Sequence, residues 1–200
     1  MELFLNATSP YARMVRIIVM ERGLADTVTL RWCDPWADDA DLIRANPAGR
    51  IPALITAKGT TLSESLLIAL YLDSFGQAEP MLPHDQLEQV LHFTGLGQSL
   101  MDAAFTTVIS RKHQDSEADG GVLGQRRWRG IRRTLDQLEG ELPTPQPTSN
   151  VTLGDIAVAV ALDYLSFRLP ELTWGNSRPQ LKAWHHTVCS RDSFRQTAFA

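Results

Sequence analysis

The feature that most constrains this chain is a change of pattern at residues 76–85, "GQAEPMLPHD". Turn-favouring residues and two prolines make this stretch a predicted linker. Before it, short apolar segments alternate with segments of helical spacing, whereas almost nothing after it has the pattern of a strand. We therefore expect a mixed α/β domain at residues 1–78, a linker at 79–85 and an all-helical domain at 86–200.

The first domain is predicted to follow the order strand, helix, strand, helix, strand, strand, helix. Its first helix has apolar residues at helical spacing and stops before Gly23, which stands at the C′ position. In its last helix we expect Leu67, Leu70 and Tyr71 to face inward. The expected strands are 2–5, 27–32, 52–56 and 60–62, and the expected helices are 11–22, 38–45 and 64–75.

The second domain is predicted to be a helical bundle. Residues 143–150, "PTPQPTSN", contain three prolines and are expected to form a loop. Thr152, with Asp155 three residues later, predicts a capping box in which Asp replaces the usual Glu or Gln. The expected helices are 86–112, 122–142, 153–169 and 179–199.

Charge and hydropathy argue against two classes of partner. The 200 residues include 19 Lys plus Arg and 23 Asp plus Glu, a net charge of -4, so nucleic-acid binding is not expected. Residues 125–133, "QRRWRGIRR", hold five arginines around Trp128, and we interpret them as a solvated helix face on which Arg132 meets Asp136. No run approaches the ~20 apolar residues of a membrane span, and the N-terminus lacks a secretion signal, so no membrane partner is expected.

The cysteines and histidines predict no metal site. Cys33 and Cys189 are the only cysteines, too few and too far apart for a metal cluster or a disulfide framework, which fits a reducing cytoplasm. His185 and His186 are adjacent, so on a helix they point to different faces. Cys33 follows a strand rather than opening a helix, and its position gives little support for a reactive thiol.

Three short segments carry candidate chemistry, and the first is Thr8-Ser9-Pro10-Tyr11. A serine before a proline can cap a helix. A hydroxyl at a helix N-terminus can also donate to a bound thiolate, because the helix dipole favours negative charge there. Lowering a thiol pKa by roughly 2 units requires about 2.7 kcal/mol, within reach of a charge-assisted hydrogen bond plus a dipole. These residues alone leave both roles open for Ser9.

The second segment is "NPAGRIPAL", residues 46–54. Pro52 at the entry of a strand cannot donate to a ladder, so we expect a special bend with a cis Ile51-Pro52 bond. Such a bend exposes the N–H and C=O of Ile51, which can pair with an extended peptide ligand as a strand would. A plain proline turn is the alternative.

The third segment is "TLSESLLIALYL", residues 61–72. Glu64 and Ser65 fall where a strand gives way to a helix. The carboxylate of Glu64 can meet an ammonium group, while the Ser65 hydroxyl and the helix-start amides can hold a carboxylate. Together they can bind the zwitterionic head of an amino acid; a cap followed by an amphipathic helix is the alternative.

In this order, the three segments resemble those of cytosolic glutathione S-transferases. "SPYARMVRI" is similar to the first-helix motif of the bacterial serine-type members, "NPAGRIPAL" to the cis-proline turn and "LSESLLIALYL" to the Glu/Asp-Ser glutathione site. "TLGDIAVA" extends the resemblance to essentially the whole chain. The resemblance implies a thioredoxin-like first domain, an all-α helical second domain and, usually, a homodimer.

The resemblance also implies residue roles. Ser9 would activate the thiol of glutathione, with Thr8 as the rival hydroxyl. Because cysteine-type relatives have Cys at the position of Ser9, exchange through a mixed disulfide is not expected as the main activity. Ile51, held by the Pro52 turn, would pair its backbone with the cysteinyl part of glutathione.

Two further contacts with glutathione follow from the same resemblance. Glu64 and Ser65 would hold its γ-glutamyl end. Arg50 stands where many relatives have Lys, and it would steer the glycyl carboxylate with a planar fork rather than a point charge.

The pocket for the second substrate is expected between the domains. The Ser9–Tyr11 loop, one face of the long helix and the carboxy-terminal segment would line it. Tyr11 and, at near-helical spacing, Phe105, Val108 and Arg111 are the candidates; ordinary packing is the alternative for each.

The implied function is that of a glutathione transferase of the kind that serves detoxification. Glutathione would be the co-substrate, with no tightly bound cofactor, and a small hydrophobic electrophile would be the acceptor. A glutathione-dependent peroxidase, thiol transferase, isomerase or dehalogenase on the same fold is the first alternative. A non-catalytic binding or regulatory protein is the second.

Overall fold

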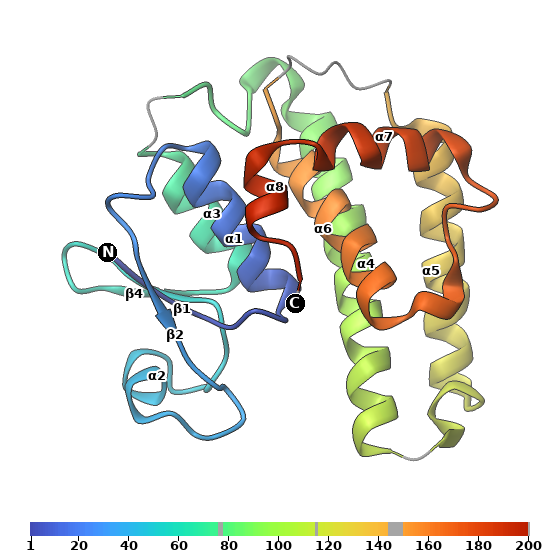
Figure 1. Cartoon of the computed structure of the whole chain (residues 1–200), viewed down its shortest axis with the longest axis horizontal. Helices are drawn as coiled ribbons and strands as arrows, with labels where there is room; N and C mark the ends of the chain where they lie inside the picture. Colours follow the sequence, from blue (N-terminus) through green and yellow to red (C-terminus); the bar gives the residue numbers. More distant parts are fainter. Residues whose placement is uncertain (76–77, 115, 144–149, 200) are drawn as a thin grey trace. The chain divides into compact units, whose positions relative to one another are not determined.

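The computed structural model describes residues 1–75, 78–114, 116–143 and 150–199 (Figure 1). The chain divides into two compact units, of which the second is Gln86–Asp192. The first comprises Met1–Asp85 together with the segment from Ser193 onward, which the sequence analysis had assigned to the helical domain. Each unit is described below by itself.

The first unit is built on a four-stranded mixed sheet in the order β2-β1-β3-β4. The strands are β1 (Glu2–Leu5), β2 (Thr29–Trp32), β3 (Ala53–Ile55) and β4 (Thr61–Ser63). β1 pairs parallel with β2 and antiparallel with β3, and β3 pairs antiparallel with β4. With its three helices this is the expected thioredoxin-like arrangement.

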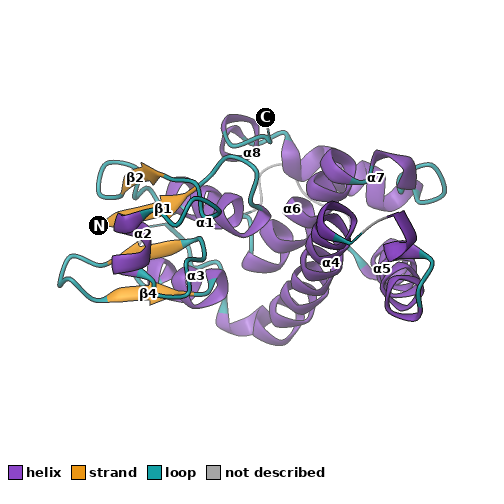
Figure 2. Ribbon diagram, turned by 90° about the horizontal axis from the view of Figure 1, so that it is seen from below, coloured by secondary structure: helices purple, strands orange, loops and turns teal. Residues whose placement is uncertain are grey.

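Three helices cover the sheet: α1 (Pro10–Glu21), α2 (Ala40–Ala45) and α3 (Ser65–Asp73). α1 and α3 pack on each other on one face, and α2 lies on the other (Figure 2). Beneath α2, Leu42 packs with Phe4 and Ala53 in a buried cluster. α1 ends as predicted, with Gly23 at a φ of 66° that favours glycine.

The prediction of which face of α3 points inward is wrong. Leu67 and Leu70 are 57% and 47% exposed, and Tyr71 is only partly buried. The buried positions are instead Ser65, Ile68, Ala69 and Leu72. Because α3 is apolar nearly all round, its spacing did not define one face, and contact with α1 and β3 decides which side is buried.

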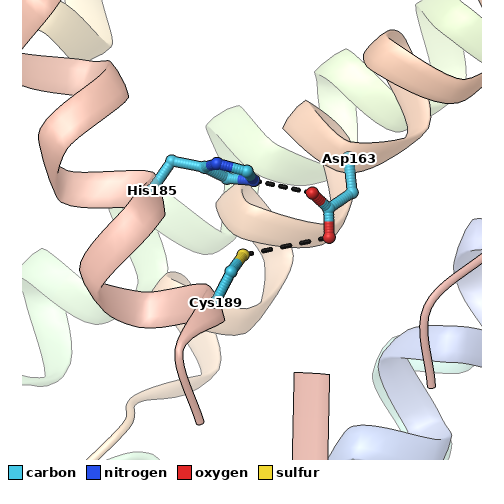
Figure 3. Close-up of side chains that lie close together, drawn as sticks. All are labelled: Asp163, His185 and Cys189. Carbon is cyan, nitrogen blue, oxygen red and sulfur yellow. Dashed lines mark hydrogen bonds and ion pairs between the residues drawn. The ribbon is translucent and has the colours of Figure 1, made fainter. Parts of the chain in front are cut away.

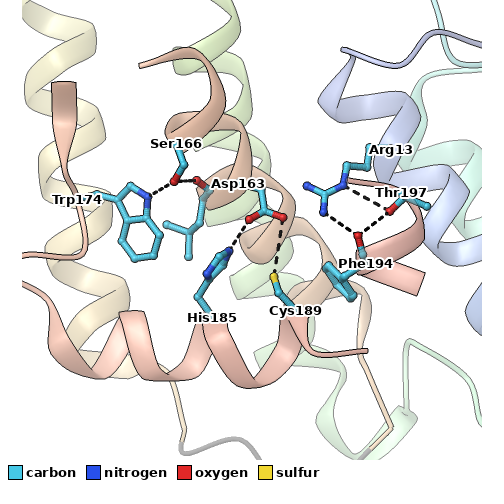
Figure 4. A network of polar contacts seen from close by, with 9 residues as sticks. Arg13, Asp163, Ser166, Trp174, His185, Cys189, Phe194 and Thr197 are labelled. Carbon is cyan, nitrogen blue, oxygen red and sulfur yellow. Dashed lines mark hydrogen bonds and ion pairs between the residues drawn. The ribbon is translucent and has the colours of Figure 1, made fainter. Parts of the chain in front are cut away.

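The C-terminal segment joins the first unit through a buried arginine of α1. Arg13 donates to the carbonyl of Phe194 at 3.3 Å and to the hydroxyl of Thr197 at 3.4 Å (Figure 4). Its guanidinium also lies over the ring of Phe199, 4.6 Å from the centroid. The prediction of one helix at 179–199 is wrong, because this segment forms two helices, α7 (Pro179–Cys189) and α8 (Asp192–Gln196).

The second unit is helical, as predicted. Its long helices are α4 (Leu87–His113), α5 (Val122–Glu141), α6 (Leu153–Arg168) and α7. Short 3-10 turns lie at Ser116–Asp119 and Pro170–Leu172, and a third, His84–Gln86, leads into α4. Of the loop predicted at 143–150, residues 144–149 lie outside the described residues.

α6 is the central helix of this unit, and most of its residues are buried. It packs along α4, where Gly97 and Gly154 let the two backbones approach closely. The predicted capping box is confirmed: Thr152 Oγ1 accepts from the amide of Asp155 at 3.1 Å, and the Asp155 carboxylate accepts from the amide of Thr152 at 2.8 Å. None of the helices in the described ranges is both long and apolar enough to cross a membrane.

The arginine-rich face of α5 differs in one detail from its prediction. Asp136 accepts two hydrogen bonds from Arg178, at 2.6 and 3.0 Å. Arg132 instead lies over the ring of Trp128, 6.0 Å from its centroid. Arg178 is distant in sequence, so helical spacing could not identify it as the partner.

Candidate functional site

The end of β1, the proline bend and the start of α3 lie at one end of the sheet in the first unit. In the β1–β3 pairing Phe4 is opposite Ala53, so the next step brings Leu5 opposite Pro52. In the β3–β4 pairing Ala53 is opposite Ser63, so the next step brings Pro52 opposite Glu64. Strand register therefore brings the end of β1, the proline bend and the start of α3 together.

Ser9 is the N-cap of α1. Its backbone is extended, and Pro10 is the first helical residue. Its Oγ accepts a hydrogen bond from the amide of Ala12 at 3.2 Å. This bond uses an oxygen lone pair and leaves the hydroxyl hydrogen to donate, so capping and thiolate stabilisation are compatible. Thr8 and Tyr11, on either side, are both partly buried.

Asn6 fixes the backbone that leads into α1. Its Oδ1 accepts hydrogen bonds from the amides of Ser9 and Thr8, at 2.8 and 3.2 Å. The side chain thus forms a turn that sets the direction of both hydroxyl-bearing residues. Asn6 was not among the predicted site residues, although an asparagine just before a helix start is a recognisable turn signal.

The Ile51-Pro52 peptide bond is cis, as predicted. Asn46, which is 8% exposed, holds the preceding turn by donating to the carbonyl of Arg50 at 2.7 Å. Within the described ranges, the main chain of Ile51 has no hydrogen-bond partner. Its N–H and C=O thus remain able to pair with an extended ligand. Sequence reasoning gave Asn46 no role of its own.

Glu64 has an unusual backbone at the start of α3. Its φ of 67° is in the left-handed region, which a non-glycine residue adopts at a cost of about 1–3 kcal/mol. It is the N-cap residue, yet its side chain makes no capping hydrogen bond. The carboxylate lies instead 3.6 Å from the guanidinium of Arg50. Ser65, the next residue, is buried at the first position of the helix.

The Arg50–Glu64 ion pair is open to solvent, with 70% and 65% of the two side chains exposed. Exposed pairs of this kind contribute only about 0–1 kcal/mol, so a ligand can replace either partner at little cost. The pair brings one cation and one anion to the same place. A ligand with both an ammonium and carboxylate groups matches that arrangement.

Of the residues predicted for the second substrate, Tyr11 lies on α1 of the first unit, and the other three lie on α4 of the helical unit. Phe105 and Val108 are partly buried, and Arg111 is exposed. Arg111 donates two hydrogen bonds to Asp119, at 2.6 and 2.9 Å, and forms an ion pair with Glu171 at 2.7 Å. These contacts raise the pKa of Arg111. Arg111 thus ties together parts of the helical unit, and its place in a substrate pocket stays a prediction.

Cys33 does not have the surroundings of a reactive thiol. Its amide donates to the carbonyl of Leu5 at 3.0 Å as β2 ends. Burial and the nearby carboxylate of Asp39 raise the pKa of the thiol. A nucleophilic role for Cys33 is therefore not supported.

Family models match both parts of the chain. The model for the glutathione S-transferase N-terminal domain matches residues 8–74, and the model for the C-terminal domain matches residues 122–186. The first of these ranges contains Ser9, the proline bend and the start of α3. The chain belongs to the glutathione S-transferase family.

Individual relatives cover almost the full chain. The uncharacterized GST-like protein YibF of Escherichia coli (strain K12) is 33% identical over 98% of both chains. A stringent starvation protein A homolog of Pasteurella multocida is 34% identical over 98% of this chain and 89% of its own.

A solved structure of a Pseudomonas fluorescens family member with bound glutathione has a TM-score of 0.91 and 33% identity, and the match covers 100% of this chain and 98% of that one. A glutathione S-transferase from Methylobacillus flagellatus, also with glutathione bound, has a TM-score of 0.89 and 28% identity, covering 100% and 99%.

Proposed function

We propose that the protein is a glutathione transferase that activates the thiol of glutathione at Ser9 for attack on a small hydrophobic electrophile. The observation that carries the proposal is the strand register, which brings the end of β1, the strand that leads to Ser9, beside the cis Ile51-Pro52 bend and the start of α3. The glutathione bound in two similar solved structures supports the same ligand here.

The chemistry assigned to Ser9 needs no general base. The thiol of bound glutathione releases its proton to solvent, and the Ser9 hydroxyl donates a hydrogen bond to the resulting thiolate. The N-terminus of α1 adds favourable dipoles. The thiolate sulfur then forms a bond to the electrophilic carbon, and the leaving group departs with its bonding electrons.

The remaining residues hold glutathione in position. The ammonium of the γ-glutamyl end pairs with Glu64, and its carboxylate binds the Ser65 hydroxyl and the first amides of α3. The main chain of Ile51 pairs with the cysteinyl residue. Arg50 forms an ion pair with the glycyl carboxylate. This contact replaces its exposed ion pair with Glu64.

The same site can serve a peroxidase, thiol transferase, isomerase or dehalogenase reaction of glutathione, so the acceptor defines the activity. We take conjugation in detoxification, in a cytoplasmic homodimer, as the function to test first. A non-catalytic binding or regulatory protein is the alternative on this fold.

Calorimetric titration with glutathione tests binding. Assays with a chloronitrobenzene and with an organic peroxide then test the reaction. The wild type should bind glutathione and conjugate the chloronitrobenzene. Ser9→Ala should still bind but lose most of the rate, whereas Thr8→Val should keep it. Absence of glutathione binding would exclude the transferase and leave the non-catalytic alternative. Full activity in Ser9→Ala with loss in Thr8→Val would assign the thiolate to Thr8.

A further inference from the structure

A second cluster of chemically active side chains lies in the helical unit. Asp163 of α6 faces both His185 and Cys189 of α7 (Figure 3). His185 Nε2 is 2.7 Å from one carboxylate oxygen of Asp163, and Cys189 Sγ is 3.8 Å from the other. One donor atom from each of the three residues lies within 4.8 Å of the other two.

The arrangement of α6 and α7 brings these three donor atoms close together. His185 and Cys189 are four residues apart on α7, so they lie on the same helix face and can reach one ion together. Asp163 comes from α6, a helix that packs against α7. The His-x3-Cys spacing is visible in the sequence but was missed, because the prediction paired His185 only with His186, which a helix directs to a different face.

The cluster is sheltered but can be reached from solvent. The side chains of His185 and Asp163 are 18% and 23% exposed, and Cys189 is partly buried. The ring of Trp174 meets that of His185 edge-on, with centroids 5.3 Å apart. The indole nitrogen of Trp174 is in turn held by Ser166 at 2.9 Å (Figure 4). Such packing restrains the imidazole, as surrounding side chains do at metal sites.

A carboxylate facing a thiol opposes formation of the thiolate, because the two negative charges repel each other. A divalent cation among the three donors changes this, since the thiolate and the carboxylate together neutralise it. For tetrahedral zinc, oxygen and sulfur ligands lie about 3.6 Å apart, close to the observed 3.8 Å. Asp163 would bind the ion through Oδ2, the oxygen that faces Cys189, and the hydrogen bond between His185 and the other oxygen, Oδ1, would be given up.

We propose that Asp163, His185 and Cys189 form a binding site for a divalent transition-metal ion of the zinc class. Mixed oxygen, nitrogen and sulfur donors suit zinc or cobalt rather than magnesium or calcium. Binding forms three bonds from protein to metal, and the thiol proton of Cys189 passes to the buffer. A water molecule completes the tetrahedron, as at zinc sites with three protein ligands.

Titration of the reduced, chelator-treated full chain with Zn²⁺ and, separately, with Co²⁺ tests the site. One equivalent should bind, and the heat in buffers of different ionisation enthalpy should report release of a proton. Co²⁺ should give tetrahedral visible bands and a thiolate charge-transfer band. Zn²⁺ should also raise the apparent Tm by several degrees, and a chelator should reverse the rise.

Matched variants separate this site from adventitious binding. Cys189→Ser and Asp163→Asn should each weaken binding by at least about 10-fold, and Cys189→Ser should abolish the charge-transfer band. Cys33→Ser and His186→Ala should bind as the wild type does, because neither residue belongs to the cluster. Circular dichroism of the metal-free variants verifies that they remain folded.

Three results would overturn the proposal. The first is no binding of Zn²⁺ or Co²⁺ by the wild type, the second is binding that survives Cys189→Ser unchanged, and the third is binding that is lost in Cys33→Ser. In each case the cluster is a set of hydrogen bonds between α6 and α7 and holds no ion.

Discussion

Among individual residues, Cys33 and Cys189 each lie near a carboxylate but in different settings. Cys33 is placed among apolar side chains at the end of β2, whereas Cys189 shares Asp163 with a histidine. Only the second setting offers several metal-ligand atoms together.

We predict that Cys33 reacts slowly with alkylating reagents. Burial raises its pKa, so less thiolate is present at a given pH than for a free cysteine. In a Cys189→Ser variant, the iodoacetamide rate plotted against pH should have its midpoint above that of a model cysteine peptide. A midpoint at or below the peptide value would show that the thiol is activated instead.

Among the elements, α4 and α6 approach each other so closely at Gly97 that no side chain fits between them. A Cβ at Gly97 would come within 2.5 Å of the backbone of Ala157 and within 2.6 Å of that of Val158. Gly95 lies two residues away on the same helix and is exposed, with nothing within 4 Å of its Cβ position. The two glycines therefore form a matched pair.

Gly97→Ala should destabilise the protein by about 1–3 kcal/mol, because the added methyl group forces two backbones apart. Gly95→Ala should leave stability unchanged or raise it by up to about 1 kcal/mol through helix propensity. Urea unfolding followed by circular dichroism measures both. Equal effects of the two substitutions would show that α4 and α6 adjust to each other without cost.

Local signals in the sequence were sufficient for most elements and for the cis bond at Ile51-Pro52. Helix caps such as Ser9 and Thr152 depend on neighbouring residues, and these were recognisable. The inner face of α3, the partner of Asp136 and the attachment of the C-terminal segment were not, because each depends on residues distant in sequence. The Asp163 cluster combines both cases, since His185 and Cys189 share a helix but Asp163 does not.

For the whole molecule, the exposed apolar side chains of α3 bear on assembly. Leu67 and Leu70 are 57% and 47% exposed, and Phe75, just after the helix, is 52% exposed. Apolar residues gathered at one surface are typical of interfaces between proteins. This observation fits the homodimer that the family resemblance implies.

We predict that the wild type is dimeric in solution and that Leu67→Glu makes it monomeric, because the interface would then bury an unpaired charge. Leu123→Glu is the matched control, since Leu123 is 70% exposed on α5. Light scattering coupled to gel filtration gives the masses. A monomeric wild type would contradict the homodimer, and a dimeric Leu67→Glu would place the interface elsewhere.

The central claim is that Ser9 stabilises the thiolate of bound glutathione. Ultraviolet absorption of the thiolate, followed as pH is raised with saturating glutathione, measures the pKa of the bound thiol directly. We predict a pKa about 2 units below that of free glutathione in the wild type, returning most of the way to the free value in Ser9→Ala. Equal values for the wild type, Ser9→Ala and free glutathione would contradict the account.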